Sequence, residues 1–329
     1  MKSEIRNLWK NKPDYSIISF KSKKYFLYYF YFFFIIVLSM KKSVFMFSLF
    51  FWGVLKLFAI PVTLDYGYEE NTPLYFGNPS DATEDEVLNE CNFLLIKKGY
   101  TVSYSNDTLC PNWVAWHLCK EDLGEATRSD KFVPDKSLPA NWYAVKKNDY
   151  QFPAYGFDRG HVCPSADRTA DDEVNQETFL MTNMIPQSPD CNRIVWKDLE
   201  SYERELVLQG NELYIFAGGY GSGGIGNRGY FEKIIINQKN DNPDENKNKA
   251  VNVPEFCWKI ILVLSEGDDD LNRIDKNTRI ICVCMPNEMG IQKTGSWEQF
   301  ECSVNYIEEI THFDFFELLD DDLEEFLEQ

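Results

Sequence analysis

Four consecutive residues at Asp158–His161, with the sequence Asp-Arg-Gly-His, place one of the three histidines of the chain beside an arginine. Further along, Asn192 and Glu200 are eight positions apart, about two helical turns, so an amide and a carboxylate would share one helix face. Metal-assisted hydrolysis of a phosphodiester needs such groups: a base for water, hard oxygen ligands for a cation, and guanidinium groups that offset negative charge. We therefore take these two segments as a candidate hydrolytic site.

The elements that must position these groups follow from the spacing of apolar residues. Apolar residues at helical spacing over 192–208 predict a helix that carries Asn192 and Glu200. Alternation over 113–118 predicts a strand, and further strands are expected over 91–104, 212–217, 253–264 and 279–285. An amphipathic stretch at 173–182 and an acidic helical region at 304–329 complete the pattern. Without an internal repeat, this mixture predicts one α+β domain.

The N-terminal part of the chain contains two apolar runs, at 25–39 and 44–62, each preceded by lysines. Met40, two lysines and the second run together have the pattern of a secretory signal peptide. We interpret residues 1–39 as an upstream extension or first apolar segment, 40–62 as a signal peptide or membrane anchor, and 63–90 as a linker. A domain at 91–320 and an acidic tail at 321–329 follow. This organisation predicts a secreted protein, or one of the periplasm or cell envelope.

The charge of the chain is unevenly distributed. The formal net charge is −19, but residues 1–60 hold ten basic and two acidic side chains, which leaves 23 basic and 50 acidic ones in the remainder. Nucleic-acid-binding domains are usually basic, so this balance argues against a passive DNA-binding scaffold. An enzyme needs only a local cationic site, and it therefore remains compatible with the composition.

The nine cysteines fit an oxidising compartment and leave one thiol unpaired. Their spacings do not match a zinc site, because no CxxC occurs. Cys282 and Cys284 are expected on one face of a strand. Cys163 and Cys191 flank the two candidate segments, and a disulfide between them is one hypothesis for how the halves of the site are joined.

The ordered motifs of residues 100–318 resemble the DNA/RNA non-specific endonucleases, the family with a ββα-metal (His-Me finger) site that includes endonuclease G. The resemblance rests on Asp158–His161 and on matches at 111–118, 127–128, 182–187, 213–218 and 313–316, together with Asn192, Trp196, Glu200 and Arg204. It implies an α+β fold in which helices flank a central antiparallel sheet.

The resemblance also implies a role for the residues that match the family's motifs. His161 would be the general base, which suits a neutral imidazole near pH 7. Asn192 would hold a single Mg²⁺, for which an amide oxygen is a hard ligand, with Mn²⁺ as the second candidate. Glu200 would orient water at the metal, and Gly160 would allow a close approach of the backbone to its neighbour.

Charged residues around the base are predicted to handle the phosphate. The side chains that would contact the phosphate and its developing charge are Arg128, Arg159 and Arg204. Substrate binding is further predicted for Asn183, Arg193 and Asp158. The residue after the metal-binding asparagine is often glutamine in the family, whereas this chain has Arg193. The change adds a positive charge beside the metal and removes no required group.

Each of these motifs also has a structural interpretation. Glu200 and Arg204 have the spacing of an exposed ion pair on a helix. His117 is expected to pack beside its strand, and His312 lies in the C-terminal helical region, so neither is assigned to catalysis. The sequence at 221–226 matches GxGxxG, but no helix pattern follows it. We interpret it as a hairpin loop beside the substrate groove and not as a dinucleotide site.

The sequence thus predicts a metal-dependent endonuclease that hydrolyses phosphodiester bonds of DNA and RNA with little sequence preference. We expect DNA and RNA to bind through contacts to their phosphates. We also predict a homodimer, and attachment to a membrane through the N-terminal apolar segment. One alternative is a non-catalytic interaction module with the same fold. Another is a phosphodiesterase restricted to small nucleotides or a special nucleic acid, or a toxin with an inhibitor partner.

Overall fold

The computed structural model describes residues 69–236 and 249–329. The two N-terminal apolar runs, and with them the predicted signal peptide or anchor, lie outside the described residues, as does most of the Asn-rich insertion before residue 249. Within the described part of the chain, no helix is both long and apolar enough to cross a membrane.

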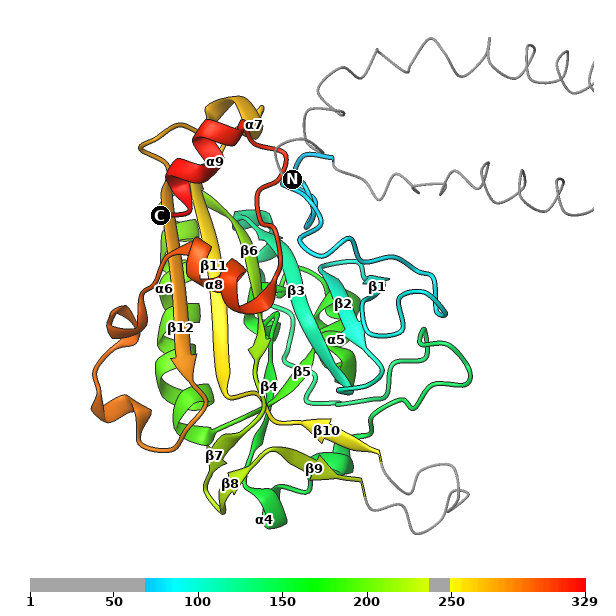
Figure 1. The fold of residues 1–329 in the computed structure, drawn as a ribbon. Helices are drawn as coiled ribbons and strands as arrows, with labels where there is room; N and C mark the ends of the chain where they lie inside the picture. The colour runs from blue at the N-terminus through cyan, green and yellow to red at the C-terminus, as the bar shows by residue number, and fades with distance from the viewer. Residues whose placement is uncertain (1–68, 237–248) are drawn as a thin grey trace, which may run out of the picture. The chain divides into compact units, whose positions relative to one another are not determined.

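A six-stranded antiparallel sheet forms the centre of the fold (Figure 1). Its strands lie in the order β1 (Phe93–Ile96), β2 (Thr101–Ser105), β3 (Cys110–Leu118), β6 (Asn211–Tyr220), β11 (Phe256–Ser265) and β12 (Arg279–Pro286). The long register between β6 and β11, from Asn211↔Ser265 to Tyr220↔Phe256, joins segments that are far apart in the sequence. These strands confirm the predicted ones, and the mixture with helices confirms the α+β fold.

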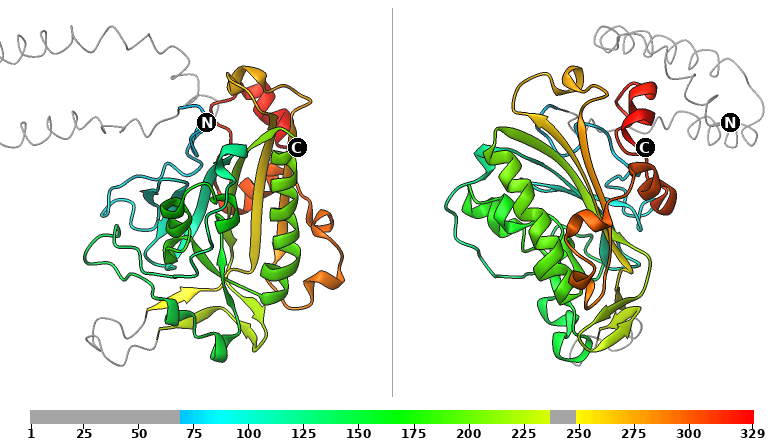
Figure 2. Two further views of the ribbon diagram at one scale, coloured as in Figure 1. Left: turned by 180° about the vertical axis from the view of Figure 1, so that it is seen from behind. Right: turned by 90° about the vertical axis from the view of Figure 1, so that its left-hand side faces the viewer.

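Helices cover both faces of this sheet (Figure 2). α6 (Lys197–Leu208) lies along one face, and α8 (Val304–Thr311) lies across the other. Side chains along β3 point alternately to the two faces of the sheet, and each face has its own hydrophobic core. Trp116 and Leu118 belong to the core on the α6 side. Trp113 and Ala115 belong to the core on the α8 side. A sheet buried on both faces gives α6 a rigid support.

Shorter elements surround the sheet. β4 (Asp158–His161) pairs with β5 (Met184–Gln187), β7 (Gly224–Gly226) with β8 (Gly229–Phe231), and β9 (Lys233–Ile235) with β10 (Ala250–Asn252). The short helices are α4 (Phe152–Tyr155), α5 (Asp172–Glu177), α7 (Asp270–Arg273) and α9 (Asp321–Leu327). The GxGxxG segment at 221–226 is part of a hairpin, but its second half is strand β7, and the turn follows at 227–228 before β8.

The packed domain is longer at both ends than the sequence indicates. Leu74, Phe76 and Ala82 are buried in the core on the α8 side, so the described part of the predicted linker at 63–90 is folded against the sheet. The predicted acidic tail at 321–329 contains α9, and both Glu324 within this helix and Glu328 just after it are buried. In both segments a few apolar residues suffice for packing, although acidic residues dominate the local composition.

All nine cysteines have free thiols in this structure. The disulfide suggested between Cys163 and Cys191 is therefore absent, and both residues are buried as ordinary core side chains. The backbone N–H and carbonyl of Cys163 are both hydrogen-bonded to the side-chain amide of Asn183. The two halves of the site are joined by hydrogen bonds and by packing.

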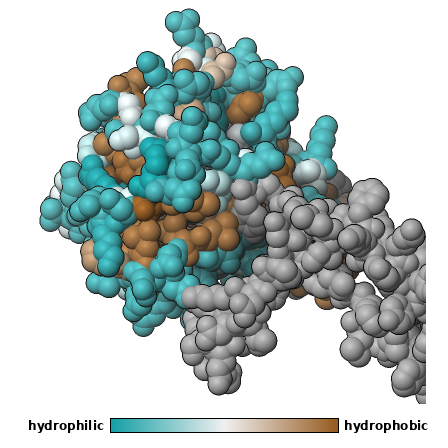
Figure 3. Space-filling model, turned by 90° about the horizontal axis from the view of Figure 1, so that it is seen from above, coloured by the Kyte–Doolittle hydropathy of each residue, from teal (hydrophilic) through white to brown (hydrophobic). Residues whose placement is uncertain are grey.

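Most of the surface seen from above is covered by hydrophilic side chains, with apolar side chains gathered in its middle (Figure 3). The excess of acidic over basic residues beyond residue 60 means that much of the polar surface is anionic. A phosphate group therefore depends on a local cluster of cations for its binding.

Candidate active site

Two short strands and a helix bring the predicted residues together. β4 pairs with β5 in an antiparallel register from Asp158↔Gln187 to His161↔Met184. After β5 the chain forms a π-helical segment, Cys191–Trp196, which continues into α6 without a break. The helix predicted over 192–208 is thus present, but its first turns are wider than an α-helix. Such π segments are rare and are frequent at functional sites.

His161 ends β4 and is nearly fully buried, with 9% of its surface exposed. Its ring lies between Phe132 and Phe179, whose centroids are 5.5 and 4.7 Å away. The Nε2 atom is buried and has no hydrogen-bond partner within the described residues. Burial, and then the positive charges of Arg128 and Arg159, lower the pKa of His161 to about 3. The imidazole is therefore neutral over the physiological range and can accept a proton.

Gly160 is required by the close pairing of β4 with β5. A Cβ atom at this position would lie 2.2 Å from Oε1 and 2.7 Å from Cβ of the buried Gln187. No larger residue fits without moving that side chain or the strand, and this confirms the predicted close approach. The register that carries His161 therefore depends on this glycine.

Asn192, on the π-helical segment, is oriented by a carboxylate from β4. Its Nδ2 donates to Oδ2 of Asp158 at 2.9 Å. Because a carboxylate only accepts, the amide nitrogen must face Asp158, and the amide oxygen Oδ1 points away as a hard ligand. The same carboxylate receives Nε and NH2 of Arg193 at 2.7 and 2.6 Å. Asp158 thus orients the amide of Asn192 and also pairs with Arg193, whose side chain remains exposed.

Glu200 lies on α6 in a partly buried position. Burial raises the pKa of its carboxyl to about 7, while the positive charges of Lys259, Arg204 and Arg128 act in the opposite direction. A cation bound nearby would favour the ionised form further. Together with Asn192, this carboxylate offers the oxygen donors that Mg²⁺ prefers.

Arg204 is not the partner of Glu200 that an exposed ion pair would require. Its NH1 donates to Oδ1 of Asp167 at 2.8 Å, and no salt bridge to Glu200 occurs among the described residues. Asp167 is fully buried, and its second oxygen accepts from the indole of Trp116 at 3.1 Å. The Arg204 guanidinium is therefore fixed by the buried Asp167 carboxylate, and its positive charge still acts on Glu200.

Arg128 and Arg159 lie over the aromatic rings that enclose His161. The guanidinium of Arg159 is 4.5 Å from the Phe132 centroid, and that of Arg128 is 5.1 Å from the Phe179 centroid. Arg128 also donates from NH1 to Oγ of Ser165 at 2.8 Å. Both guanidiniums act on the same imidazole, and Arg128 acts on Glu200 as well. The predicted cations are thus gathered around the base.

A buried ion pair below α6 was missed by reasoning from the sequence. Lys259 donates to Glu203 at 2.8 Å, and both side chains are fully buried. The ammonium also lies over the rings of Trp196 and Trp116, 4.5 and 5.4 Å from their centroids. A signal was present, because Lys259 interrupts an otherwise apolar strand, and lysine is rarely buried without a partner.

Asn183 has a different position from the one predicted. Its side chain is fully buried, accepts from the Cys163 backbone N–H at 2.9 Å, and donates to the carbonyls of Cys163 and Thr178. It therefore fixes the turn that follows His161 and is not accessible to substrate. This role is structural, although it supports the base directly.

A second group of potential metal ligands lies near the end of β3. Ligand atoms of His117, Cys119 and Asp122 are within 4.8 Å of one another. His117 is paired with Glu212 at 3.1 Å, and the guanidinium of Arg168 lies 3.2 Å from Asp122. Two of the three candidate ligands are therefore already paired with other protein side chains. His117 packs beside its strand, as predicted.

Comparisons with known proteins agree with this geometry. The family model for DNA/RNA non-specific endonucleases matches residues 79–322. A nuclease of Nostoc sp. is 43% identical over 242 residues, which cover 74% of this chain and 79% of that protein. Nuclease C1 of Cunninghamella echinulata is 27% identical over 252 residues, which cover 75% of this chain and 88% of that protein.

Solved structures agree as well. A crystal structure of the EndoG/EndoGI complex aligns with a TM-score of 0.58 and 23% identity, covering 75% of this chain and 91% of that one. At this identity it shows the fold, which is that of a ββα-metal nuclease. The family model spans most of the chain, and the Nostoc nuclease is similar over the same part. This chain therefore belongs to the DNA/RNA non-specific endonuclease family and is a nuclease.

Proposed function

We propose that this nuclease hydrolyses phosphodiester bonds inside DNA and RNA strands with the help of Mg²⁺, and that His161 is its general base. The observation that carries the proposal is the neutral imidazole of His161, which lies in the same ββα unit as Asn192 and Glu200 and whose buried Nε2 atom has no hydrogen-bond partner in the described part of the chain. A base of this kind takes a proton from water without first releasing one.

The other residues of the site have complementary tasks. Asn192 would hold the cation through Oδ1, with Asp158 fixing the amide. The chemistry that Mg²⁺, or Mn²⁺ in its place, supplies when bound is stabilisation of negative charge on the phosphate and the leaving oxygen. Arg204 and Arg128 would bind the phosphate oxygens, and Glu200 would accept a hydrogen bond from water near the site.

Little sequence preference is expected, because these contacts address phosphate and not base edges. The acidic remainder of the domain makes binding depend on the few cations around His161. Cleavage should therefore weaken steeply as the salt concentration rises. The retention of His161 and Asn192 in the sequence supports a catalytic protein over a non-catalytic module of the same fold.

Cleavage of supercoiled plasmid and of single-stranded RNA tests the proposal. We expect both to be cut with Mg²⁺ and neither with EDTA. Asn192→Ala should need about 10–100-fold more Mg²⁺ for half-maximal rate, if the amide is a ligand. Asn305→Ala, on α8 across the sheet, is the matched control and should behave as wild type. Undiminished cleavage in EDTA would contradict the role of the metal.

We also propose that the chain is exported, on the basis of Met40, the two lysines after it and the apolar run at 44–62. Sequencing the N-terminus of the mature protein from its native source tests this, and retention of Met1 would contradict it. A homodimer and attachment to a membrane stay predictions.

A further inference from the structure

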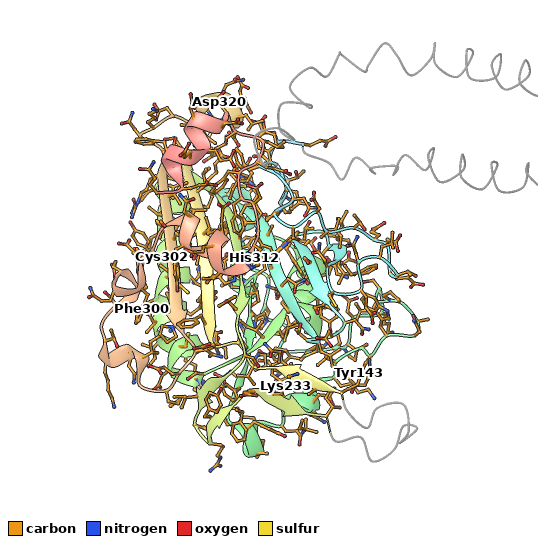
Figure 4. All side chains as sticks on the ribbon, in the orientation of Figure 1. Tyr143, Lys233, Phe300, Cys302, His312 and Asp320 are labelled. Carbon is orange, nitrogen blue, oxygen red and sulfur yellow. The ribbon has the colours of Figure 1, made fainter. Side chains whose placement is uncertain are left out.

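Cys282 and Cys302 lie directly opposite each other across the edge of the central sheet. Val283 forms an antiparallel bridge with Glu301, so the residues one step outward on each strand are Cys282 and Cys302. The Cys302 backbone N–H donates to the Cys282 carbonyl at 3.0 Å. Figure 4 shows Cys302 beside β12, at the edge of the sheet. Opposite residues of an antiparallel pair point to the same side, so both thiols share one face.

The two sulfur atoms are in contact. They are 3.6 Å apart. Cα atoms of a hydrogen-bonded antiparallel pair are about 5.5 Å apart, which lies within the range that a disulfide spans. Closing the gap to the length of an S–S bond therefore needs side-chain rotation and little movement of the backbone.

One of the two thiols is more accessible than the other. Cys302 is partly exposed, whereas Cys282 is buried. The contact with the Cys282 thiol lowers the pKa of Cys302, and the pKa of Cys282 is raised by the same contact and by burial. Thiolate forms at the sulfur that an oxidant can reach, which is the arrangement that thiol–disulfide exchange requires.

We propose that Cys282 and Cys302 form a disulfide that ties the connection at 287–301 to the sheet and thereby supports the segment that carries Asn192. The oxidant is a low-molecular-weight disulfide such as oxidised glutathione. The Cys302 thiolate attacks one of its sulfurs and releases one thiol. The Cys282 sulfur then displaces the second thiol as its own proton leaves, so that one S–S bond forms, one breaks, and two thiols are produced.

The loop that this bond closes contacts the backbone just before Asn192. The buried side chain of Asn287 accepts from the Ser188 N–H at 2.6 Å and donates to the Pro186 carbonyl at 2.9 Å. The Gly290 N–H donates to Oδ2 of Asp190 at 2.8 Å. Residues 186–190 lead into the π-helical segment, so a loop that opens would loosen the support of Asn192. Oxidation restrains that opening.

Peptide mapping of the full chain tests the bond. The protein is reduced, equilibrated with oxidised and reduced glutathione, alkylated and cut with trypsin. Cleavage after Arg279 and Lys293 gives peptides 280–293 and 294–329, which the proposal predicts to be linked. Since Cys284 shares the first peptide, Cys284→Ser must retain the link and Cys282→Ser must lose it. Absence of the linked pair in wild-type protein, or a link that depends on Cys284, would overturn the proposal.

The supporting role rests on the proposed metal site and has a readout of its own. Oxidised protein should melt about 5–10 °C higher than reduced protein, and the difference should vanish in Cys302→Ser. Isothermal titration with Mg²⁺ alone should show tighter binding to the oxidised form. Equal Tm values for the linked and unlinked protein would overturn the proposal that the disulfide restrains this part of the chain. A higher Tm on oxidation, with no Mg²⁺ binding in either form, would instead count against the proposed metal site.

Discussion

Replacing Lys259 by methionine is a stringent test of the buried charges below α6. The Lys259 ammonium and the Glu203 carboxylate are 2.8 Å apart and fully buried. Removing one partner of such a pair leaves an uncompensated charge and costs about 3–5 kcal/mol. Each kcal/mol lowers the Tm of a domain of this size by about 2–4 °C, so we expect a fall of about 10 °C in a thermal melt.

The same substitution should change catalysis in a way that lost stability alone does not. Burial raises the pKa of Glu200 to about 7, and the positive charge of Lys259 opposes that rise. Without Lys259 the pKa of Glu200 rises further, so less carboxylate is ionised at neutral pH. The acidic limb of the kcat/KM profile, measured with an oligonucleotide well below the Tm, should move to higher pH.

The double substitution Lys259→Met with Glu203→Leu is the matched control for stability. Apolar side chains in place of a buried ion pair are often neutral or stabilising, so most of the lost Tm should return. The reasoning fails if Lys259→Met melts like wild type. It also fails if kcat/KM falls equally at every pH, because the substitution would then act only through the amount of folded protein.

Three further predictions concern the strands around the base. Gly160→Ala should destabilise the fold by about 1–3 kcal/mol in urea unfolding and reduce cleavage, because the new Cβ would lie 2.2 Å from Oε1 of Gln187. Unchanged stability would show that β4 and β5 are less closely paired. Asp158→Ala should weaken Mg²⁺ binding about 10–100-fold in calorimetry, since the Asn192 amide loses its 2.9 Å hydrogen bond, and wild-type affinity would contradict this role. His161 has an ordinary pKa of 6.5 and a folded pKa of about 3, so the unfolded chain binds more protons between these values and stability is lost as pH falls through that window. Metal-free wild type should lose about 3 kcal/mol more than His161→Gln between pH 7 and pH 4, and parallel pH profiles of the two would refute the shift.

Local patterns in the sequence predict much of this fold. The alternation at 113–118, the apolar run at 253–264 and the helical spacing at 192–208 each reflect burial of one face or two, and each corresponds to an observed element. The strand order does not follow from such patterns, because the pairing of β3 with β6 joins segments separated by a long stretch of chain. The burial of Leu74 and Phe76 is equally non-local, since their short apolar run lies in a polar stretch with no strand or helix pattern.

The candidate site was predictable to a similar degree. His161, Asn192 and Glu200 are set by a motif and by helical spacing, and the structure brings their elements together. The orienting role of Asp158 depends on a hydrogen bond to a residue far along the chain, and Asn183 is buried for reasons of packing. Asp167 and Lys259 were missed because only the fold brings them to α6.

The most direct measurement compares wild type with His161→Ala in single-turnover cleavage of a DNA oligonucleotide at saturating Mg²⁺. Far-UV circular dichroism and Mg²⁺ binding should first show that both proteins are folded and loaded. If His161 removes the proton from the attacking water, the variant is slower by about 10²–10⁴-fold at pH 7. Equal rates for the two proteins would contradict the assignment of His161 as the general base.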